Sequence, residues 1–174
     1  MSTPSLVHVY TGEGKGKTTA ALGLAVRNIG HGNRAMVVQF LKSPGFYNEC
    51  RAADRLENLD IFSNAPSCLV FEEGPREEDR KAACEALEVA GEALSSGRYG
   101  LVVLDEITIA IRYGLVRVED VVKVVKGRAE GVEVVLTGRY AQPELLDMAD
   151  YITEMRCVRH PYERGILSRS GIDK

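Results

Sequence analysis

The chain has 174 residues, of which 45% are hydrophobic and 27% are charged, a length and composition that suit one globular domain with a substantial core. Its formal net charge of −3 gives no electrostatic basis for binding nucleic acid or an anionic membrane. No apolar run is long enough to span a bilayer, and residues 1–5 lack the regions of a signal peptide. The four cysteines are widely spaced, which predicts reduced thiols in the cytoplasm rather than a metal site. We therefore expect a single cytoplasmic domain over residues 1–174, with no nucleic acid and no membrane among its partners.

The first predicted elements are a strand over residues 6–11 and a helix over residues 18–29. Gly12, Gly14 and Gly16 lie between them, and they allow positive φ angles and close approach to an anion. Backbone N–H groups at the positive end of the helix would then surround a phosphate. The connecting segment is Thr11-Gly12-Glu13-Gly14-Lys15-Gly16-Lys17-Thr18-Thr19. Strand, glycine-rich turn and helix are the context of a phosphate-binding P-loop.

The P-loop pattern also assigns roles to two side chains. Lys17 is expected to reach the outer phosphate oxygens, and the Thr18 hydroxyl to bind a magnesium ion. The first position of the general pattern is Thr11 instead of glycine. A glycine-rich turn without a ligand is the alternative, but the flanking strand and helix favour a nucleoside triphosphate site.

The next part of the chain predicts strands over residues 34–41 and 59–62, with a helix over residues 48–57 between them. Residues 63–75 combine turn-forming residues with Leu69, Val70 and Phe71. Such a segment could be a lid, a partner surface or a short packed hairpin, and the residues alone favour the hairpin.

Residues 76–96 predict a long amphipathic helix. Ala83, Leu87, Ala90 and Leu94 recur at helical spacing, and acidic residues occupy the first turn, where the helix dipole favours them. Cys84 on this helix is expected to be a small buried hydrophobe.

Four apolar residues, 101–104, precede Asp105 and Glu106, which resembles a Walker B strand. A buried parallel strand would carry both carboxylates to the carboxyl edge of the sheet, beside the P-loop. Carboxylate oxygens suit magnesium, so we expect Thr18, Asp105 and Glu106 to hold the ion. The alternative is a strand that ends in a solvated acidic turn.

The remaining segments predict a helix near residues 118–125, a strand over 132–137, a short helix over 143–148 and a strand over 151–155. Arg139 follows the carboxyl end of a strand, where it could reach a phosphate or ribose, or form a surface salt bridge. Residues 156–174 are expected to be an extended segment on the surface. The alternation of strands and helices predicts an α/β fold with a mostly parallel, doubly wound sheet, as in RecA-like P-loop NTPases.

Over nearly its whole length the sequence resembles the P-loop ATP:corrinoid adenosyltransferases, also called cob(I)yrinic acid a,c-diamide adenosyltransferases. Thr11 in the first position of the P-loop is itself a feature of that family. The resemblance rests on residues 10–21, 38–42, 103–107, 136–139, 149–150, 154–156, 160–161, 165 and 171–173.

This resemblance implies transfer of the 5′-deoxyadenosyl group of ATP to the Co(I) of a reduced corrinoid, with release of triphosphate. It implies catalytic roles for Lys17, Thr18 and Glu106. Thr18, Asp105 and Glu106 would hold Mg²⁺ or Mn²⁺. The implied ATP contacts are Thr11, Gly12, Glu13, Gly14, Lys15, Gly16, Lys17, Thr18, Thr19 and Arg139.

The resemblance also implies how the corrinoid is held. Leu69 and Phe71 match a Phe-x-Trp pair that contacts the corrinoid in well-known members, so residues 63–75 are expected to be a corrinoid lid. The sequence contains no tryptophan, and no counterpart is expected of the N-terminal helix that covers the corrinoid in some relatives. The implied partners are cobalamin, cobinamide or cobyrinic acid diamide as substrate, a reduced flavoprotein as electron donor, and a second copy in a homodimer.

Two other functions remain as alternatives. A P-loop small-molecule kinase or NTPase would release ADP or phosphate and usually carries an arginine-bearing lid, whereas residues 66–75 contain no arginine before Arg76. A regulatory module would bind ATP irrespective of corrinoid.

Overall fold

The computed structural model describes residues 4–45, 47–66 and 74–173. Over these residues, six parallel strands form one sheet in the order β3-β2-β4-β5-β1-β6, so the predicted parallel sheet is confirmed. The strands are β1 (Val7–Thr11), β2 (Ala35–Gln39), β3 (Leu59–Ser63), β4 (Leu101–Asp105), β5 (Glu133–Thr137) and β6 (Tyr151–Glu154).

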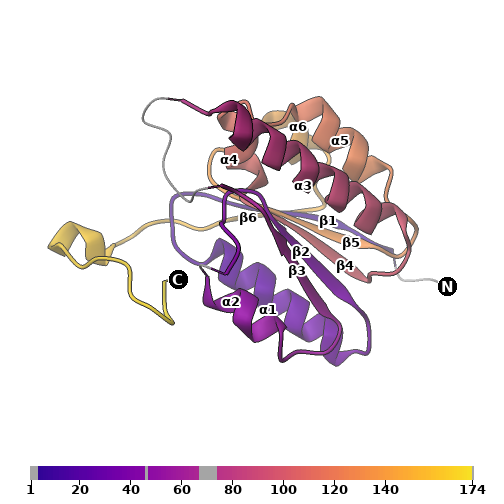
Figure 1. The fold of residues 1–174 in the computed structure, drawn as a ribbon, viewed down its shortest axis with the longest axis horizontal. Coiled ribbons are helices and arrows are strands. Elements are labelled where there is room, and N and C mark those ends of the chain that lie inside the picture. Colours follow the sequence, from indigo (N-terminus) through magenta and orange to yellow (C-terminus); the bar gives the residue numbers. More distant parts are fainter. Residues whose placement is uncertain (1–3, 46, 67–73, 174) are drawn as a thin grey trace.

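Helices cover both faces of this sheet, as a doubly wound fold requires (Figure 1). α1 and α2 lie on one face, and α3, α4, α5 and α6 lie on the other. The helices are α1 (Lys17–Gly30), α2 (Asn48–Ala53), α3 (Glu77–Ser95), α4 (Ile107–Arg112), α5 (Val118–Lys126), α6 (Pro143–Asp147) and the 3₁₀ helix η1 (Pro161–Arg164).

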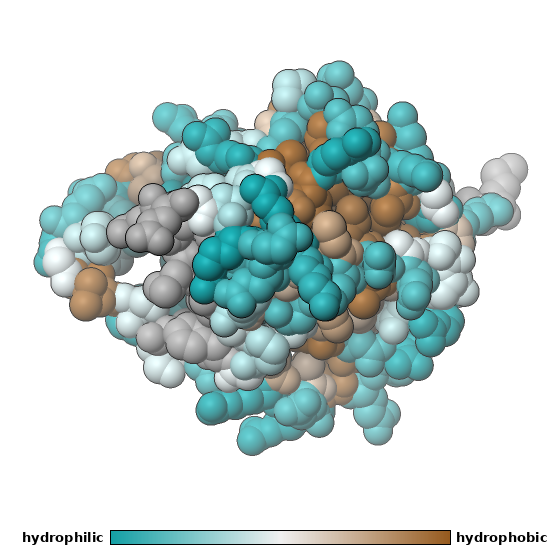
Figure 2. Space-filling model, turned by 45° about the horizontal axis from the view of Figure 1, so that its top comes forward, coloured by the Kyte–Doolittle hydropathy of each residue, from teal (hydrophilic) through white to brown (hydrophobic). Residues whose placement is uncertain are grey.

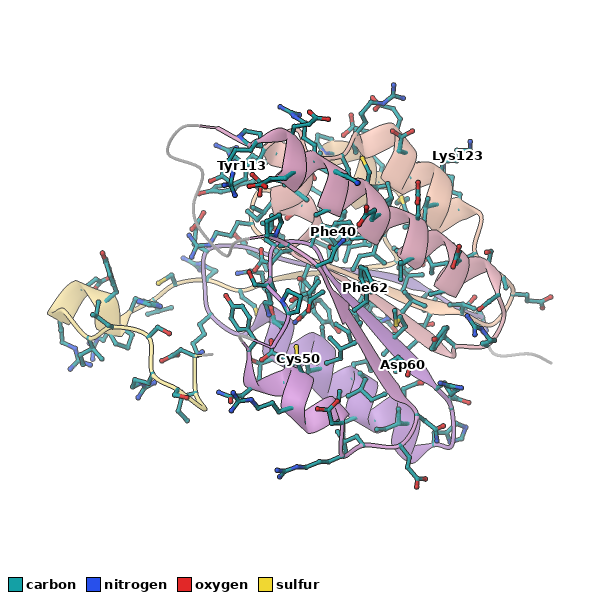
Figure 3. All side chains as sticks on the ribbon, viewed as in Figure 1. Phe40, Cys50, Asp60, Phe62, Tyr113 and Lys123 are labelled. Carbon is teal, nitrogen blue, oxygen red and sulfur yellow. The ribbon has the colours of Figure 1, made fainter. Side chains whose placement is uncertain are left out.

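Small side chains bring the longest helices close to the sheet. α1 packs through the buried Ala21 and Ala25, and α3 packs through a row of buried alanines that ends at Leu94. Phe40 and Phe62 lie on the α3 side of the sheet, Phe40 fully buried and Phe62 packed against the same core (Figure 3). The expected apolar stripe of residues 76–96 is therefore confirmed, with Leu87 only half-buried.

Several local expectations differ from the structure. Cys84 is exposed because it lies off the buried stripe of α3, so the prediction that it is buried is wrong. The helix expected over residues 48–57 ends at Ala53 and is followed by turns. α4 was not predicted, because its sequence, rich in β-branched residues, lacks a clear helical pattern.

The C-terminal segment, residues 156–173, projects from the sheet and curves back instead of lying extended on the surface (Figure 1). It includes η1, which begins where the ring of His160 accepts a hydrogen bond from the backbone N–H of Tyr162. Large apolar side chains on this segment are exposed, including Val158 and Leu167. Figure 2 shows small apolar areas on this segment and a broader apolar area on the body of the molecule.

Among the described residues, no helix combines the length and apolar character needed to cross a membrane.

Candidate nucleotide-binding site

The order of the strands brings the P-loop and Asp105 to the same edge of the sheet. β1, which leads into the P-loop, is separated from β4 only by β5. All strands are parallel, so their carboxyl ends meet at one edge, the usual location of ligand sites in α/β folds. A cavity of about 930 Å³ opens there, lined by the P-loop, the segment after β2 and the C-terminal segment.

The glycines of the P-loop serve two different purposes. Gly12 and Gly16 have φ angles of 93° and 117°, which only glycine adopts without strain. Gly14 does not share this conformation. Its N–H donates to the carbonyl of Met155 at 2.6 Å, and a Cβ there would lie 2.8 Å from the carbonyl carbon of Arg156. Gly14 therefore permits close packing of the P-loop on the residues after β6, which corrects the expectation of a positive φ.

Lys17 is the first residue of α1 and is buried. Its Nζ donates to the carbonyl oxygens of Gly12 and Gly14, both at 2.7 Å. Burial lowers the pKa of Lys17, and the negative charge of Glu106 partly opposes this effect. The side chain is thus folded against its own loop, at the base of the cavity.

Asp105, at the end of β4, is fully buried and accepts contacts on both carboxylate oxygens. Oδ1 accepts hydrogen bonds from the hydroxyls of Thr18 at 2.8 Å and Thr137 at 2.7 Å. Oδ2 lies 3.0 Å from the Nζ of Lys42. The structure therefore joins Thr18 to Asp105, as predicted, and adds Thr137 and Lys42. Both added residues lie in segments that carry the family resemblance, but sequence analysis gave neither a role, because these contacts depend on the pairing of β2, β4 and β5.

Lys42 also contacts the first turn of α2. Its Nζ donates to Glu49 Oε1 at 2.9 Å and lies 4.5 Å from the ring centroid of Tyr47. Burial alone would lower the pKa of Lys42, but the carboxylates of Asp105 and Glu49 more than offset this and raise it. The lysine is therefore held as a cation.

Glu106 adopts a left-handed backbone conformation with φ 62°, immediately before α4. Its N–H donates to the hydroxyl of Thr137 at 3.0 Å, while its side chain lines the cavity. Burial raises the pKa of Glu106, and the charge of Asp105 raises it further. Among the described residues, none donates a hydrogen bond to the Glu106 carboxylate, so this group is available to a ligand.

Arg139 forms an ion pair within the same site. Its Nη1 lies 2.9 Å from Glu13 Oε2 in the P-loop, and both side chains are about half exposed at 51%. The salt bridge considered as one alternative is thus present, but at the cavity rather than on a distant surface.

The C-terminal segment lines one side of the cavity and contacts the P-loop. Lys15 Nζ lies 2.7 Å from Asp173 Oδ1 and donates to the Ile172 carbonyl at 3.0 Å. Asp173 also accepts from the backbone N–H and Nε of Arg169. The hydrogen bond from Lys15, followed by those from Arg169, lowers the pKa of Asp173. Sequence analysis included parts of this segment in the family resemblance but did not place it at the site, because it was expected to be extended on the surface.

The predicted site residues are brought together in large part. The cavity is lined by seven of the predicted P-loop residues and by Glu106 and Arg139, with Asp105 buried behind Thr18. Leu69 and Phe71, predicted to contact the corrinoid, lie outside the described residues. The predicted residues that line the cavity are Glu13, Gly14, Lys15, Gly16, Lys17, Thr18, Thr19, Glu106 and Arg139.

The parallel sheet, the P-loop and the adjoining Asp105 and Glu106 together define an α/β protein of the P-loop nucleotide-binding class. The sequence model of the family described as "ATP:corrinoid adenosyltransferase BtuR/CobO/CobP" matches residues 3–173. The chain belongs to this family, which confirms the resemblance seen in the sequence.

Individual relatives agree with the family match. The chain is 36% identical to the corrinoid adenosyltransferase of Salmonella typhimurium, over 97% of this chain and 85% of the relative. It is 34% identical to that of Escherichia coli K12, over the same shares of the two chains. With the corrinoid adenosyltransferase of Pseudomonas aeruginosa the identity is 34%, over 95% of this chain and 81% of the relative.

Proposed function

We propose that this protein transfers the 5′-deoxyadenosyl group of ATP to the Co(I) of a reduced corrinoid and releases triphosphate. The observation that carries the proposal is the meeting of Lys17, Thr18 and Glu106 at one cavity, in a chain that belongs to the corrinoid adenosyltransferase family. ATP and a corrinoid are the substrates of that family.

The reaction requires positioning and charge stabilisation more than proton transfer. Co(I) donates an electron pair to the ribose 5′ carbon, a cobalt–carbon bond forms, and the carbon–oxygen bond to the triphosphate breaks. The electron pair of the broken bond leaves with the triphosphate, so no protein base is needed. We expect the added charge to be stabilised by Lys15, Lys17, Arg139 and those N–H groups of the P-loop other than that of Gly14, which donates to Met155.

We propose a magnesium or manganese ion at the corner of this cavity where Thr18 and Glu106 meet. When bound, such an ion would neutralise charge on the phosphate oxygens. We propose Thr18, Asp105 and Glu106 as the residues of its site, with Asp105 acting through the Thr18 hydroxyl that donates to it and not as a direct ligand. Among them, Glu106 has the carboxylate without a hydrogen bond from a described residue.

Other parts of the proposal rest on the family resemblance. We propose cobalamin, cobinamide or cobyrinic acid diamide as the corrinoid, a reduced flavoprotein as electron donor and a homodimer as the assembly. The roles of Leu69 and Phe71 in contacting the corrinoid stay predictions, as does the cytoplasmic location. Light scattering coupled to size-exclusion chromatography would test the homodimer, and a mass of about 19 kDa would contradict it.

The deciding experiment is an anaerobic incubation with ATP, Mg²⁺ and a chemically reduced corrinoid, followed by analysis of both products. We expect an adenosylated corrinoid and intact triphosphate. ADP or phosphate without a new cobalt–carbon bond would instead support the P-loop kinase or NTPase alternative. ATP binding without any product, and without dependence on corrinoid, would support a regulatory module.

A further inference from the structure

Lys42 is a buried lysine that connects three elements at the edge of the cavity. It follows β2, and its Nζ lies 3.0 Å from Asp105 Oδ2 at the end of β4. The same Nζ lies 2.9 Å from Glu49 Oε1 in the first turn of α2. Lys42 is only 8% exposed, so water screens its charge little. The carboxylates of Asp105 and Glu49 balance that charge.

The contacts of Asp105 limit what its carboxylate can bind. Oδ1 already accepts the hydroxyls of Thr18 and Thr137, and Oδ2 is paired with Lys42. Asp105 is 0% exposed, so an ion could reach Oδ2 only if Lys42 withdrew. The Thr18 hydroxyl donates its proton to Asp105, which leaves the lone pairs of its oxygen available to a ligand.

We propose that Lys42 is a positioning residue. Its ammonium group, held between Glu49 and Asp105, acts as a tethered cation that occupies Asp105 Oδ2. It keeps Asp105 oriented toward the Thr18 hydroxyl and prevents that carboxylate from binding a divalent ion directly. Glu106 then remains the carboxylate that faces the ion. This inference rests on the proposed function in one respect, namely that the cavity receives a nucleotide together with a divalent ion.

A direct contact between Lys42 and the triphosphate is the competing role, since Lys42 also lines the cavity. Asp105 and Glu49 take two of the three N–H donors of the ammonium group, so one is left for a phosphate, and a closer approach would require the ammonium to leave a carboxylate. Leaving a fully buried carboxylate without its partner is strongly unfavourable. The observed pairing therefore favours the tethered role.

The test is a titration of the nucleotide-free protein with Mn²⁺. Binding is measured from the electron paramagnetic resonance signal of the Mn²⁺ that stays free. Lys42→Met removes a positive charge that repels Mn²⁺ and occupies Asp105 Oδ2, so we expect Mn²⁺ to bind at least about tenfold more tightly than to wild type. Lys42→Arg keeps a cation at this position and should bind Mn²⁺ as weakly as wild type. The double variant Lys42→Met with Asp105→Asn should lose the added affinity.

Two results would overturn the proposal. One is a Lys42→Met variant whose Mn²⁺ affinity equals that of wild type while its affinity for metal-free ATP falls, as expected for a direct triphosphate contact. The other is an added Mn²⁺ affinity that persists in the double variant. The Mn²⁺ titration contains neither ATP nor corrinoid, and the ATP-binding measurement contains no corrinoid, so loss of adenosyl transfer by the wild-type protein would contradict the proposed function without affecting these results.

Loss of Lys42 could also unfold the protein, so circular dichroism is recorded throughout the titration. If Lys42→Met is unfolded without metal, the tethered role predicts that Mn²⁺ restores the native spectrum and that the double variant folds without it. Failure of Mn²⁺ to restore the fold, with a double variant that is no better folded, would contradict the proposal.

Discussion

Burial shifts the pKa values of two charged side chains at the phosphate end of the cavity in opposite directions. It lowers the pKa of Lys17 and raises that of Glu106, so in both cases it opposes the charged form. These two side chains attract each other, which offsets part of that cost. Burial thus favours the neutral form of each side chain, whereas a bound nucleotide and cation would favour the charged forms.

Replacing Lys17 should separate the contribution of its ammonium group to ATP turnover from the contribution of the P-loop backbone. Lys17→Ala removes the ammonium group that contacts the Gly12 and Gly14 carbonyls, and we expect kcat/KM for ATP to fall by about 100-fold or more. Steady-state kinetics with reduced corrinoid would measure this. Lys123→Ala is a matched control, because Lys123 is exposed on α5 (Figure 3). Unchanged turnover in Lys17→Ala would contradict the assignment of the P-loop.

Glu106→Gln should stabilise the nucleotide-free protein while impairing the reaction. The pKa of Glu106 is raised above its ordinary value of 4.5, so its ionised form destabilises the fold once the pH exceeds the folded-state pKa. At neutral pH we expect the variant to have a higher Tm, by about 2–4 °C for each kcal/mol by which its free energy of unfolding increases. The difference should shrink as the pH falls toward 4.5.

The control for this measurement is Glu88→Gln, which changes an exposed carboxylate on α3 and should leave Tm unchanged. A Glu106→Gln variant that is less stable at neutral pH, or that keeps full metal-dependent turnover, would contradict the proposed role of this residue.

At the residue scale, the sequence predicted the parts of the site that lie in continuous motifs. Lys17 and Thr18 were predicted because the P-loop fixes their spacing, and Glu106 because it directly follows a buried strand. Lys42 and Thr137 were not assigned roles, because their positions depend on which strands lie beside β4. That order of strands is a long-range property that local patterns do not specify.

The P-loop is supported by the residues after β6 as well as by its own helix. The Gly14 N–H donates to the Met155 carbonyl, and the Met155 N–H donates to the Thr11 carbonyl at 2.8 Å. β6 therefore helps to define the shape of the P-loop before any nucleotide binds, which reduces the ordering that binding must accomplish.

Gly14→Ala should disrupt this contact. The added Cβ would lie 2.6 Å from the Met155 carbonyl oxygen, and relieving such overpacking costs about 1–3 kcal/mol. We expect reduced unfolding free energy and weaker ATP binding, measured by chemical denaturation and calorimetric titration.

Gly23→Ala in α1 is the matched control, because no atom lies within 4 Å of its added Cβ. It should stabilise the helix by about 0.5–1 kcal/mol. Equal effects of the two substitutions would show that the contact with Met155 does not constrain the P-loop.

The C-terminal segment and the P-loop are connected through Lys15 and Asp173. The pKa of Asp173 is lowered, so the ion pair persists at neutral pH and is lost only as the pH falls through that lowered value. In Asp173→Asn, Lys15 is released, and we expect trypsin to cleave after Arg164 and Arg169 faster, by less than about tenfold because the pair is partly exposed.

ATP binding by Asp173→Asn should be no weaker than in wild type, because Lys15 then lacks a competing carboxylate. Asp147→Asn, at the exposed end of α6, is the control for cleavage and binding. Markedly weaker ATP binding in Asp173→Asn alone would show that Asp173 supports nucleotide binding instead of competing with it.

Among the elements, those with strong periodicity were predicted and α4 was not. Its sequence Ile107–Arg112 is rich in β-branched side chains, and it begins directly after the left-handed residue Glu106 without a polar cap. The tertiary structure overrides its weak local preference. The turn at η1 depends on a side-chain contact of His160, which sequence periodicity does not reveal.

For the whole molecule, the sheet connects two hydrophobic cores. Val102 and Leu104 of β4 point into the core beneath α3 and α5, whereas Leu101 and Val103 point into the core beneath α1. Successive side chains of a strand alternate between its faces. Loss of the sheet would therefore expose both cores together.

We expect one cooperative unfolding transition, in keeping with the single domain predicted from the sequence. Differential scanning calorimetry should give equal calorimetric and van't Hoff enthalpies, with a total of about 120 kcal/mol for an unfolding midpoint near 60 °C. Two separate transitions would contradict a single domain.

The position of β1 within the sheet has a consequence for protein synthesis. β1 leaves the ribosome before the other five described strands, yet its neighbours in the sheet are β5 and β6, which come last among them. While most of the chain is translated, β1 therefore lacks its neighbouring strands, and the same holds for the P-loop and α1 that follow it. Nascent chains stalled before residue 133 should be unable to retain ATP, and nucleotide binding should begin only when β5 and β6 have emerged.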